Sequence, residues 1–154
     1  MPKIDPKKTA KLSADILKKI CLAVIILLAA ISIIITNASI NGSLVINKFL
    51  LPVISLFFAY MGNVMISLKP NYFAGIRVPW TLESPDNWRA THRMAGKLWF
   101  ICGIVLTMLT LVLPTTTAFI VFMVCVGILV IVPIGYSYNY FKKNAHNNLT
   151  KKEG

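Results

Sequence analysis

The sequence has few charges, and acidic residues are the rarest of them. Of 154 residues only 14% are charged, with 5 Asp or Glu against 16 Lys or Arg. A soluble domain is about one quarter charged, so this deficit excludes an ordinary water-soluble enzyme domain. The formal net charge of +11 fits either a nucleic-acid partner or the inner surface of a membrane, since both attract Lys and Arg.

Charged residues are missing altogether from three long runs, which lie between Lys19 and Lys48, between Lys48 and Lys69, and between Lys97 and Lys142. About 20 apolar residues at 1.5 Å each cross the roughly 30 Å hydrocarbon layer. The third run would make a single helix of about 66 Å, so it must fold back. Pro114, which is followed by three threonines, is the natural place for that turn.

The sequence therefore predicts an all-α, polytopic membrane protein with four transmembrane helices, near residues 20–36, 49–68, 97–113 and 118–138. The first run could also be a cleaved signal peptide. Its apolar stretch is longer than the 7–15 residues usual in a signal peptide, and the residues that follow it form a poor signal-peptidase cleavage site. We therefore expect a retained helix.

All the Lys and Arg residues except Lys48 fall in the N-terminal tail, the loop between the second and third helices, or the C-terminal tail. The positive-inside rule then places both termini and that loop in the cytoplasm. We expect a basic tail over residues 1–19, one membrane domain over 20–140 with a structured loop at 69–97, and a second basic tail over 141–154. Topology and anionic lipid explain the charge, which disfavours nucleic-acid binding.

Asp, Glu, Lys, Arg and His are absent from the interior of the predicted spans, although pumps and proton-coupled transporters usually need an ionisable group at depth. No His, Cys or carboxylate spacing suggests a catalytic triad, a metal site or a cofactor, and we expect no catalytic residue. The strongest polar residue in a span is Asn63, beside Gly62. An interhelical hydrogen bond is its default role, and ligand binding is the alternative. Glycines such as Gly127 and Gly135 are expected to pack helices closely.

The central loop does not have the composition of a plain connector. Ser84-Pro85-Asp86 is typical of a helix start, with a hydroxyl cap, proline in the first turn and an acid near the positive helix end. The helix that follows carries Arg89, Arg93 and Lys97 at four-residue steps. Trp88 and His92 lie on a neighbouring face. We interpret this stretch as an interfacial anchor, with a cytoplasmic-face site as the alternative.

Residues 69–82 read KPNYFAGIRVPWTL and are followed by Trp88, His92 and a Gly96-Lys97 pair. This run resembles the signature of the SdpI family, over about residues 45–140. Nothing in generic membrane patterning demands that order of residues. The motif and candidate binding positions are Asn63, Pro70, Asn71, Gly75, Ile76, Arg77, Pro79, Trp80, Trp88, Arg89, His92, Arg93 and Gly96.

The family consists of bacterial membrane proteins named for immunity to the sporulation-delaying-protein toxin. The resemblance implies a cytoplasmic membrane location and non-enzymatic protection against a membrane-active toxin peptide. In the best-known member it also implies sequestration of a transcriptional repressor. Longer members carry a further N-terminal membrane domain, whereas here one predicted helix, near residues 20–36, precedes the region of resemblance at about 45–140.

Two alternatives remain open from the residues alone. A regulatory docking protein would use the basic stripe of Arg89, Arg93 and Lys97 to engage a cytoplasmic regulator or anionic lipids. A lipid-handling enzyme or carrier would instead bring His92, Asn63 and the motif arginines together in a deep polar pocket.

Overall fold

The fold is entirely helical in the described part of the chain. The computed structural model describes residues 6–41, 44–70 and 74–150, with side chains at 14–40, 46, 48–70 and 74–144. The described helices are α1 (Pro6–Asn41), α2 (Leu44–Ile66), α3 (Pro79–Glu83), α4 (Pro85–Val112) and α5 (Thr115–Thr150). All except the short α3 are long and apolar enough to cross a membrane, which confirms the four predicted spans.

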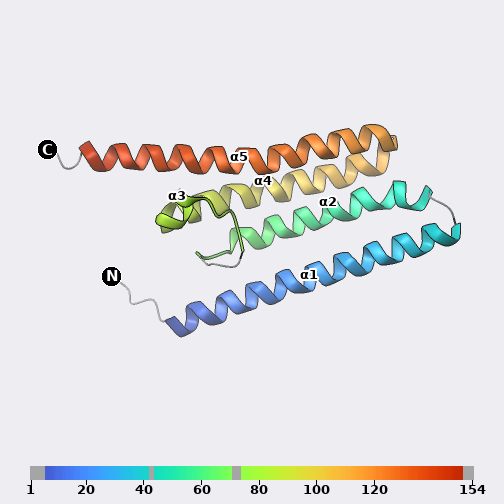
Figure 1. Ribbon diagram of the computed structural model, residues 1–154, viewed down its shortest axis with the longest axis horizontal. Helices are drawn as coiled ribbons and strands as arrows, with labels where there is room; N and C mark the ends of the chain where they lie inside the picture. Colours follow the sequence, from blue (N-terminus) through green and yellow to red (C-terminus); the bar gives the residue numbers. More distant parts are fainter. Residues whose placement is uncertain (1–5, 42–43, 71–73, 151–154) are drawn as a thin grey trace.

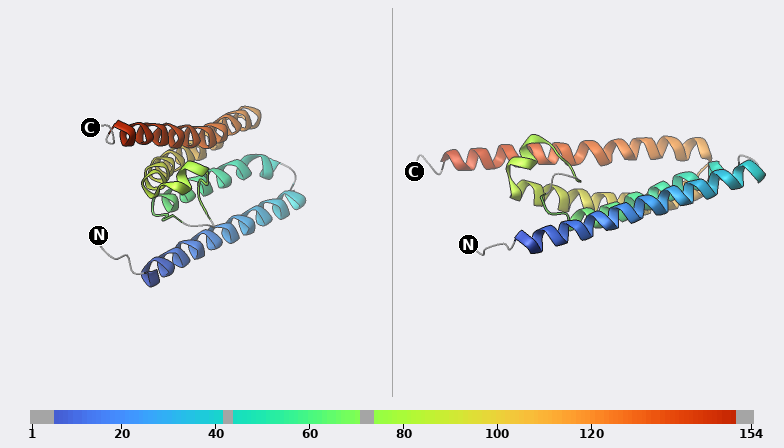
Figure 2. Two further views of the ribbon diagram at one scale, coloured as in Figure 1. Left: turned by 60° about the vertical axis from the view of Figure 1, so that its left-hand side comes forward. Right: turned by 60° about the horizontal axis from the view of Figure 1, so that its bottom comes forward.

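The long helices lie side by side in the order α1, α2, α4, α5 (Figures 1 and 2). Among the described helices α1 contacts α2 alone, while α4 lies between α2 and α5. An apolar groove of about 470 Å³ follows the seam between α1 and α2, with Ile26 and Phe57 among the residues that line it. The start of α1, α3 and the end of α5 lie at one end of the molecule (Figure 1).

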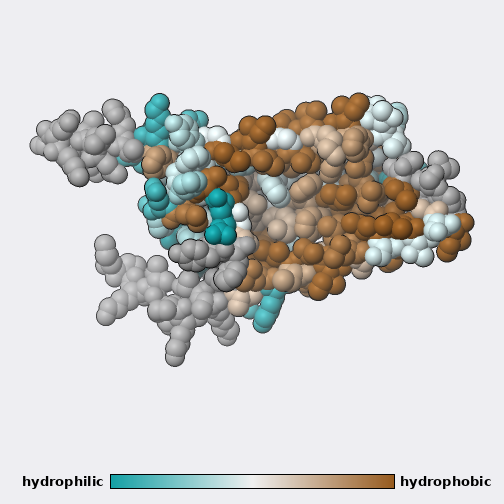
Figure 3. All heavy atoms as spheres, viewed as in Figure 1, coloured by the Kyte–Doolittle hydropathy of each residue, from teal (hydrophilic) through white to brown (hydrophobic). Residues whose placement is uncertain are grey.

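Apolar side chains cover the outside of the long helices, as a lipid-facing surface requires. Figure 3 shows this apolar surface over the helices, with hydrophilic side chains gathered at the end that carries α3. Exposed examples are Ile33, Met108 and Ile131, at 62%, 65% and 70%. The outer surface thus has the distribution expected of a multi-pass membrane protein.

Glycines allow α2 and α4 to approach to backbone contact. A Cβ atom at Gly62 would meet the backbone nitrogen of Phe100 and lie 2.7 Å from the carbonyl oxygen of Gly96. A Cβ at Gly103 would lie 2.7 Å from the Cα of Ala59. Small residues at such contacts give helices in lipid the close packing on which their association depends. The α2–α4 pair is therefore the tightly packed centre of the row.

Several sequence expectations need correction. The helices α1 and α5 extend well past the predicted 20–36 and 118–138, because hydropathy marks the apolar part of a helix and not its ends. The break at Leu113 and Pro114 is where the sequence places it, but the threonines after it begin α5 and do not form a turn. The expectation that Gly127 and Gly135 pack helices closely was wrong, since nothing lies within 4 Å of a Cβ at either position.

The predicted start of the third long helix is confirmed. The Ser84 side chain accepts a hydrogen bond from the Asn87 backbone N–H at 3.3 Å, Pro85 occupies the first turn, and Asp86 lies beside it. These are the features that stabilise a helix N-terminus. They fix the direction in which α4 leaves the segment between α2 and α4.

Candidate functional site

The candidate site is the interhelical segment, residues 67–84, together with the first turns of α4 and the part of α5 beside them. The segment is described at 67–70 and 74–84. Its short helix α3 packs against both α4 and α5. Asn71 is a predicted motif position that lies outside the described residues. The segment therefore folds back onto the long helices and does not hang free as a connector.

His92 holds the segment by its main chain. The imidazole is 1% exposed, its Nδ1 lies 2.9 Å from the Trp88 carbonyl oxygen, and its Nε2 lies 2.9 Å from the Ile76 backbone nitrogen. A carbonyl only accepts and an amide N–H only donates, so Nδ1 carries the proton and Nε2 accepts. The contacts thus select one neutral tautomer, and both ring nitrogens are occupied by backbone.

Gly75 is the one described residue with positive φ, at +119°, a conformation in which a side chain is strained. A Cβ there would also meet Nε2 of His92 and come within 3.1 Å of the Trp88 ring. The Trp88 and His92 rings stack with their centroids 4.0 Å apart. Gly75 thus allows the chain to pass close enough for Ile76 to reach His92.

A second set of contacts joins the segment to α4 and α5 through Asn87, which is 1% exposed. Its side-chain amide donates to the Trp80 and Ser137 carbonyl oxygens, both at 3.1 Å. Its carbonyl oxygen accepts from the Thr91 hydroxyl at 3.0 Å. One side chain therefore ties three parts of the chain together. We call Thr81, Asn87, Thr91, His92 and Ser137 the buried polar network.

Thr81 closes the segment on itself. Its Oγ1 lies 2.9 Å and 2.8 Å from the Ile76 and Val78 carbonyl oxygens, and it accepts from the Val78 backbone N–H at 3.1 Å. No buried polar side-chain atom among the described residues lacks a partner. A fully satisfied buried network of this kind specifies one conformation.

The three tryptophans each join two elements through the indole N–H. Trp88 donates to the Leu68 carbonyl at 3.1 Å, Trp80 to the Ser137 hydroxyl at 2.7 Å, and Trp99 to the Leu129 carbonyl at 2.9 Å. Because Trp88 is fully buried, its interpretation as an anchor at the lipid headgroups was wrong. The Leu68 carbonyl that it contacts lies beyond the end of α2, which stops at Ile66 and not at the predicted residue 68.

The remaining motif positions fall into two groups. Gly96 is buried against α2, and Ile76 and Trp80 are half-buried. The exposed group contains Asn63, Pro70, Arg77, Pro79, Arg89 and Arg93. Sequence reasoning missed Asn87 and Ser137 as key residues. The only signal was the four-residue spacing of Asn87 and Thr91, which places them on one helix face.

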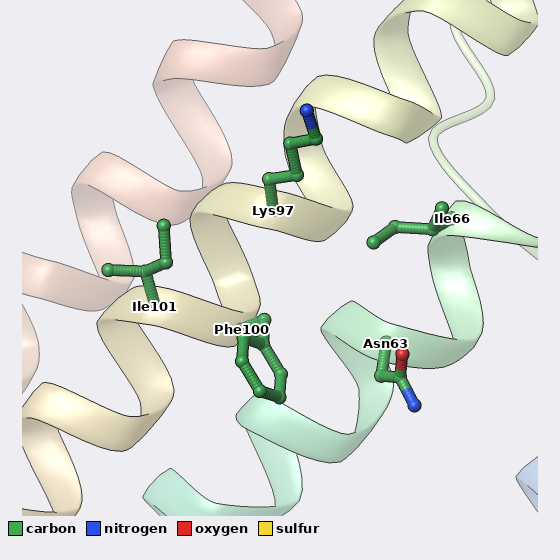
Figure 4. Close-up of a pocket in the computed structure, with 5 residues that line it drawn as sticks. All are labelled: Asn63, Ile66, Lys97, Phe100 and Ile101. Atoms are coloured by element: carbon green, nitrogen blue, oxygen red, sulfur yellow. The ribbon is translucent and has the colours of Figure 1, made fainter.

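Asn63 and His92 do not line a common pocket in the described structure. The Asn63 side chain is exposed and forms no hydrogen bond with another described residue, so the expected interhelical hydrogen bond is not formed. It lines a cavity on the outside of α2 and α4, and Figure 4 shows its amide pointing away from α4. Within the described residues, no group of three His, Cys, Asp or Glu could hold a metal ion.

Fold and site together define a multi-pass helical membrane protein whose second and third spans are connected by an ordered, internally hydrogen-bonded segment. Residues 67–137 match the sequence model of the SdpI/YfhL protein family. The chain is also 30% identical over 92 residues to the immunity protein SdpI of Bacillus subtilis (strain 168). These matches confirm the resemblance over the region that contains the site.

The match to the Bacillus protein covers 58% of this chain and 43% of the length of that protein. No solved structure matches the chain.

Proposed function

We propose that this chain is an immunity protein of the bacterial cytoplasmic membrane, which protects its host without catalysis against a membrane-active toxin peptide. The observation that carries the proposal is the similarity to an immunity protein together with the family match over residues 67–137. The matched region begins at the end of α2 and runs to Ser137, so it contains the whole buried polar network. In this chain the region that matches the family therefore holds α2, α4 and α5 together.

In this proposal the toxin is intercepted within or beside the helices, and the interhelical segment keeps α2, α4 and α5 in their relative positions. The proposal suits an apolar, lipid-facing protein in which neither ring nitrogen of His92 is available as an acid or base. A binding protein for an apolar peptide needs rigid surfaces in the membrane more than it needs reactive groups.

We further propose that both termini and the interhelical segment face the cytoplasm. The start of α1, α3 and the end of α5 share one end of the molecule (Figure 1). In the sequence, all the Lys and Arg residues except Lys48 fall in the N-terminal tail, between the second and third spans, or in the C-terminal tail, and the positive-inside rule favours a cytoplasmic location for these parts. Alkaline phosphatase fused to the C-terminus should be inactive, because this reporter enzyme matures only outside the cytoplasm. Full activity of the fusion would contradict this orientation.

The function is tested in a bacterium that is sensitive to the sporulation-delaying toxin and lacks its own immunity gene. Expression of the chain is expected to restore growth in the toxin and to preserve the membrane potential, measured with a potential-sensitive dye. An unrelated four-span protein at the same membrane abundance is the control. Loss of potential at the same toxin dose in both strains would contradict the proposal.

A further inference from the structure

Three cations project from one exposed face of α4. Arg89, Arg93 and Lys97 recur at four-residue steps, which places them one above another along the helix. All are exposed, and none forms an ion pair with another described residue. The buried polar network does not use them. They form a strip of uncompensated positive charge along the first part of α4, which begins at Pro85.

A surface cavity of about 250 Å³ lies where this strip ends. It is formed between α2 and α4 and lined by Asn63, Ile66, Lys97, Phe100 and Ile101. Figure 4 shows Lys97 extending along α4 in the direction away from Ile101, with Phe100 between the two helices. The cavity therefore has a cationic rim toward the α3 end of the molecule and apolar walls below it.

We propose that this face binds one anionic phospholipid. Its phosphate would lie beside Lys97 and Arg93, and the first part of an acyl chain would fill the cavity against Ile66, Phe100 and Ile101. Charge complementarity favours this occupant, because basic residues near the membrane surface attract anionic lipid, and a long Lys side chain reaches the headgroups from within a span. The site does not depend on the immunity function.

The apolar half of the site argues against a soluble occupant. Phe100 and Ile101 are 45% and 60% exposed and belong to a candidate membrane span, where a cytoplasmic protein cannot reach them. Free phosphate would neutralise the cations but leave the apolar walls unfilled. A lipid satisfies both halves at once.

The first experiment counts the lipids retained by the purified protein in native mass spectrometry, with phosphatidylglycerol and phosphatidylcholine of equal chain length as probes. The intact chain should retain phosphatidylglycerol preferentially. The double variant R93Q/K97Q should bind it about tenfold or more weakly. The matched control K142Q/K143Q removes the same charge from two exposed positions of α5 and should leave retention unchanged. Circular dichroism checks that the helices persist.

A second pair of variants tests the cavity with every charge in place. Ile101→Trp places a larger side chain at the cavity wall and should lower retention. Met108→Trp, two turns further along α4 and similarly exposed at 65%, should not. Equal losses in the two charge variants, no preference between the lipids, or displacement by millimolar inorganic phosphate would each overturn the site. The site would also be overturned if a soluble protein bound to Arg89, Arg93 and Lys97 while the chain showed no preference between the two lipids.

Discussion

Replacing Asn87 by aspartate is expected to lower the free energy of unfolding by about 3 kcal/mol, although the two side chains have the same shape. The amide nitrogen of Asn87 donates to the carbonyl oxygens of Trp80 and Ser137, both at 3.1 Å. A carboxylate oxygen in its place faces two acceptors, and burial at 1% exposure prevents water from compensating. The Thr91 hydroxyl keeps its acceptor, so the loss reflects the two donated bonds together with the cost of burying a carboxylate.

The measurement is the apparent melting temperature of the purified protein in a single detergent, with and without the substitution. Asn139→Asp is the matched control, because it makes the same chemical change at an exposed position of α5. It should leave the melting temperature nearly unchanged. If both variants have the same melting temperature as the unchanged protein, Asn87 does not hold the interhelical segment in the way described.

Replacing Gly62 by alanine is expected to have an effect of similar size on the α2–α4 pair. The new methyl group would meet the Phe100 nitrogen and lie 2.7 Å from the Gly96 carbonyl oxygen. These neighbours are backbone atoms and cannot rotate aside, so the two helices must separate. Overpacking costs about 1–3 kcal/mol, and we expect the upper part of that range because Gly96 and Gly103 lie in the same seam.

Gly127→Ala is the control for this substitution, since a Cβ at Gly127 meets nothing within 4 Å and alanine is the better helix former. Its melting temperature should stay equal or rise slightly, while that of Gly62→Ala falls. Equal behaviour of the two variants would show that α2 and α4 are further apart than the structure places them.

The parts of the fold that the sequence predicts are those set by local chemistry. Runs without charge define the four spans, since an unpaired charge in hydrocarbon is costly. Ser84, Pro85 and Asp86 locate the start of α4, because capping depends on residues next to one another. The signature itself is visible because Gly75, Trp88 and His92 occur in an order that membrane insertion does not require.

What the sequence does not predict depends on partners distant in the chain. The sequence favours an interfacial anchor at Trp88. In the structure this side chain is fully buried and its N–H donates to the Leu68 carbonyl. Ser137 is an ordinary polar residue until Trp80 and Asn87 reach it from 57 and 50 residues away. Periodicity gives the face of a helix, but it does not say which neighbour covers that face.

The structure also changes the meaning of the signature. Its most distinctive residues, Gly75, Trp88, His92 and Gly96, contact other parts of the protein. Its exposed positions include Pro70, Arg77, Pro79, Arg89 and Arg93. In this chain the signature therefore builds internal structure first, and its exposed positions form part of the surface.

The central claim is that the signature builds an ordered segment fastened to α4 and α5. Backbone hydrogen–deuterium exchange of the protein in lipid nanodiscs tests it most directly. The amides of Ile76, Val78, Thr81 and Leu82 all donate hydrogen bonds, so the peptide that contains them should exchange far more slowly than unstructured chain. Asn87→Asp should accelerate that exchange. Exchange of this peptide at the rate of unstructured chain in the unsubstituted protein would contradict the claim.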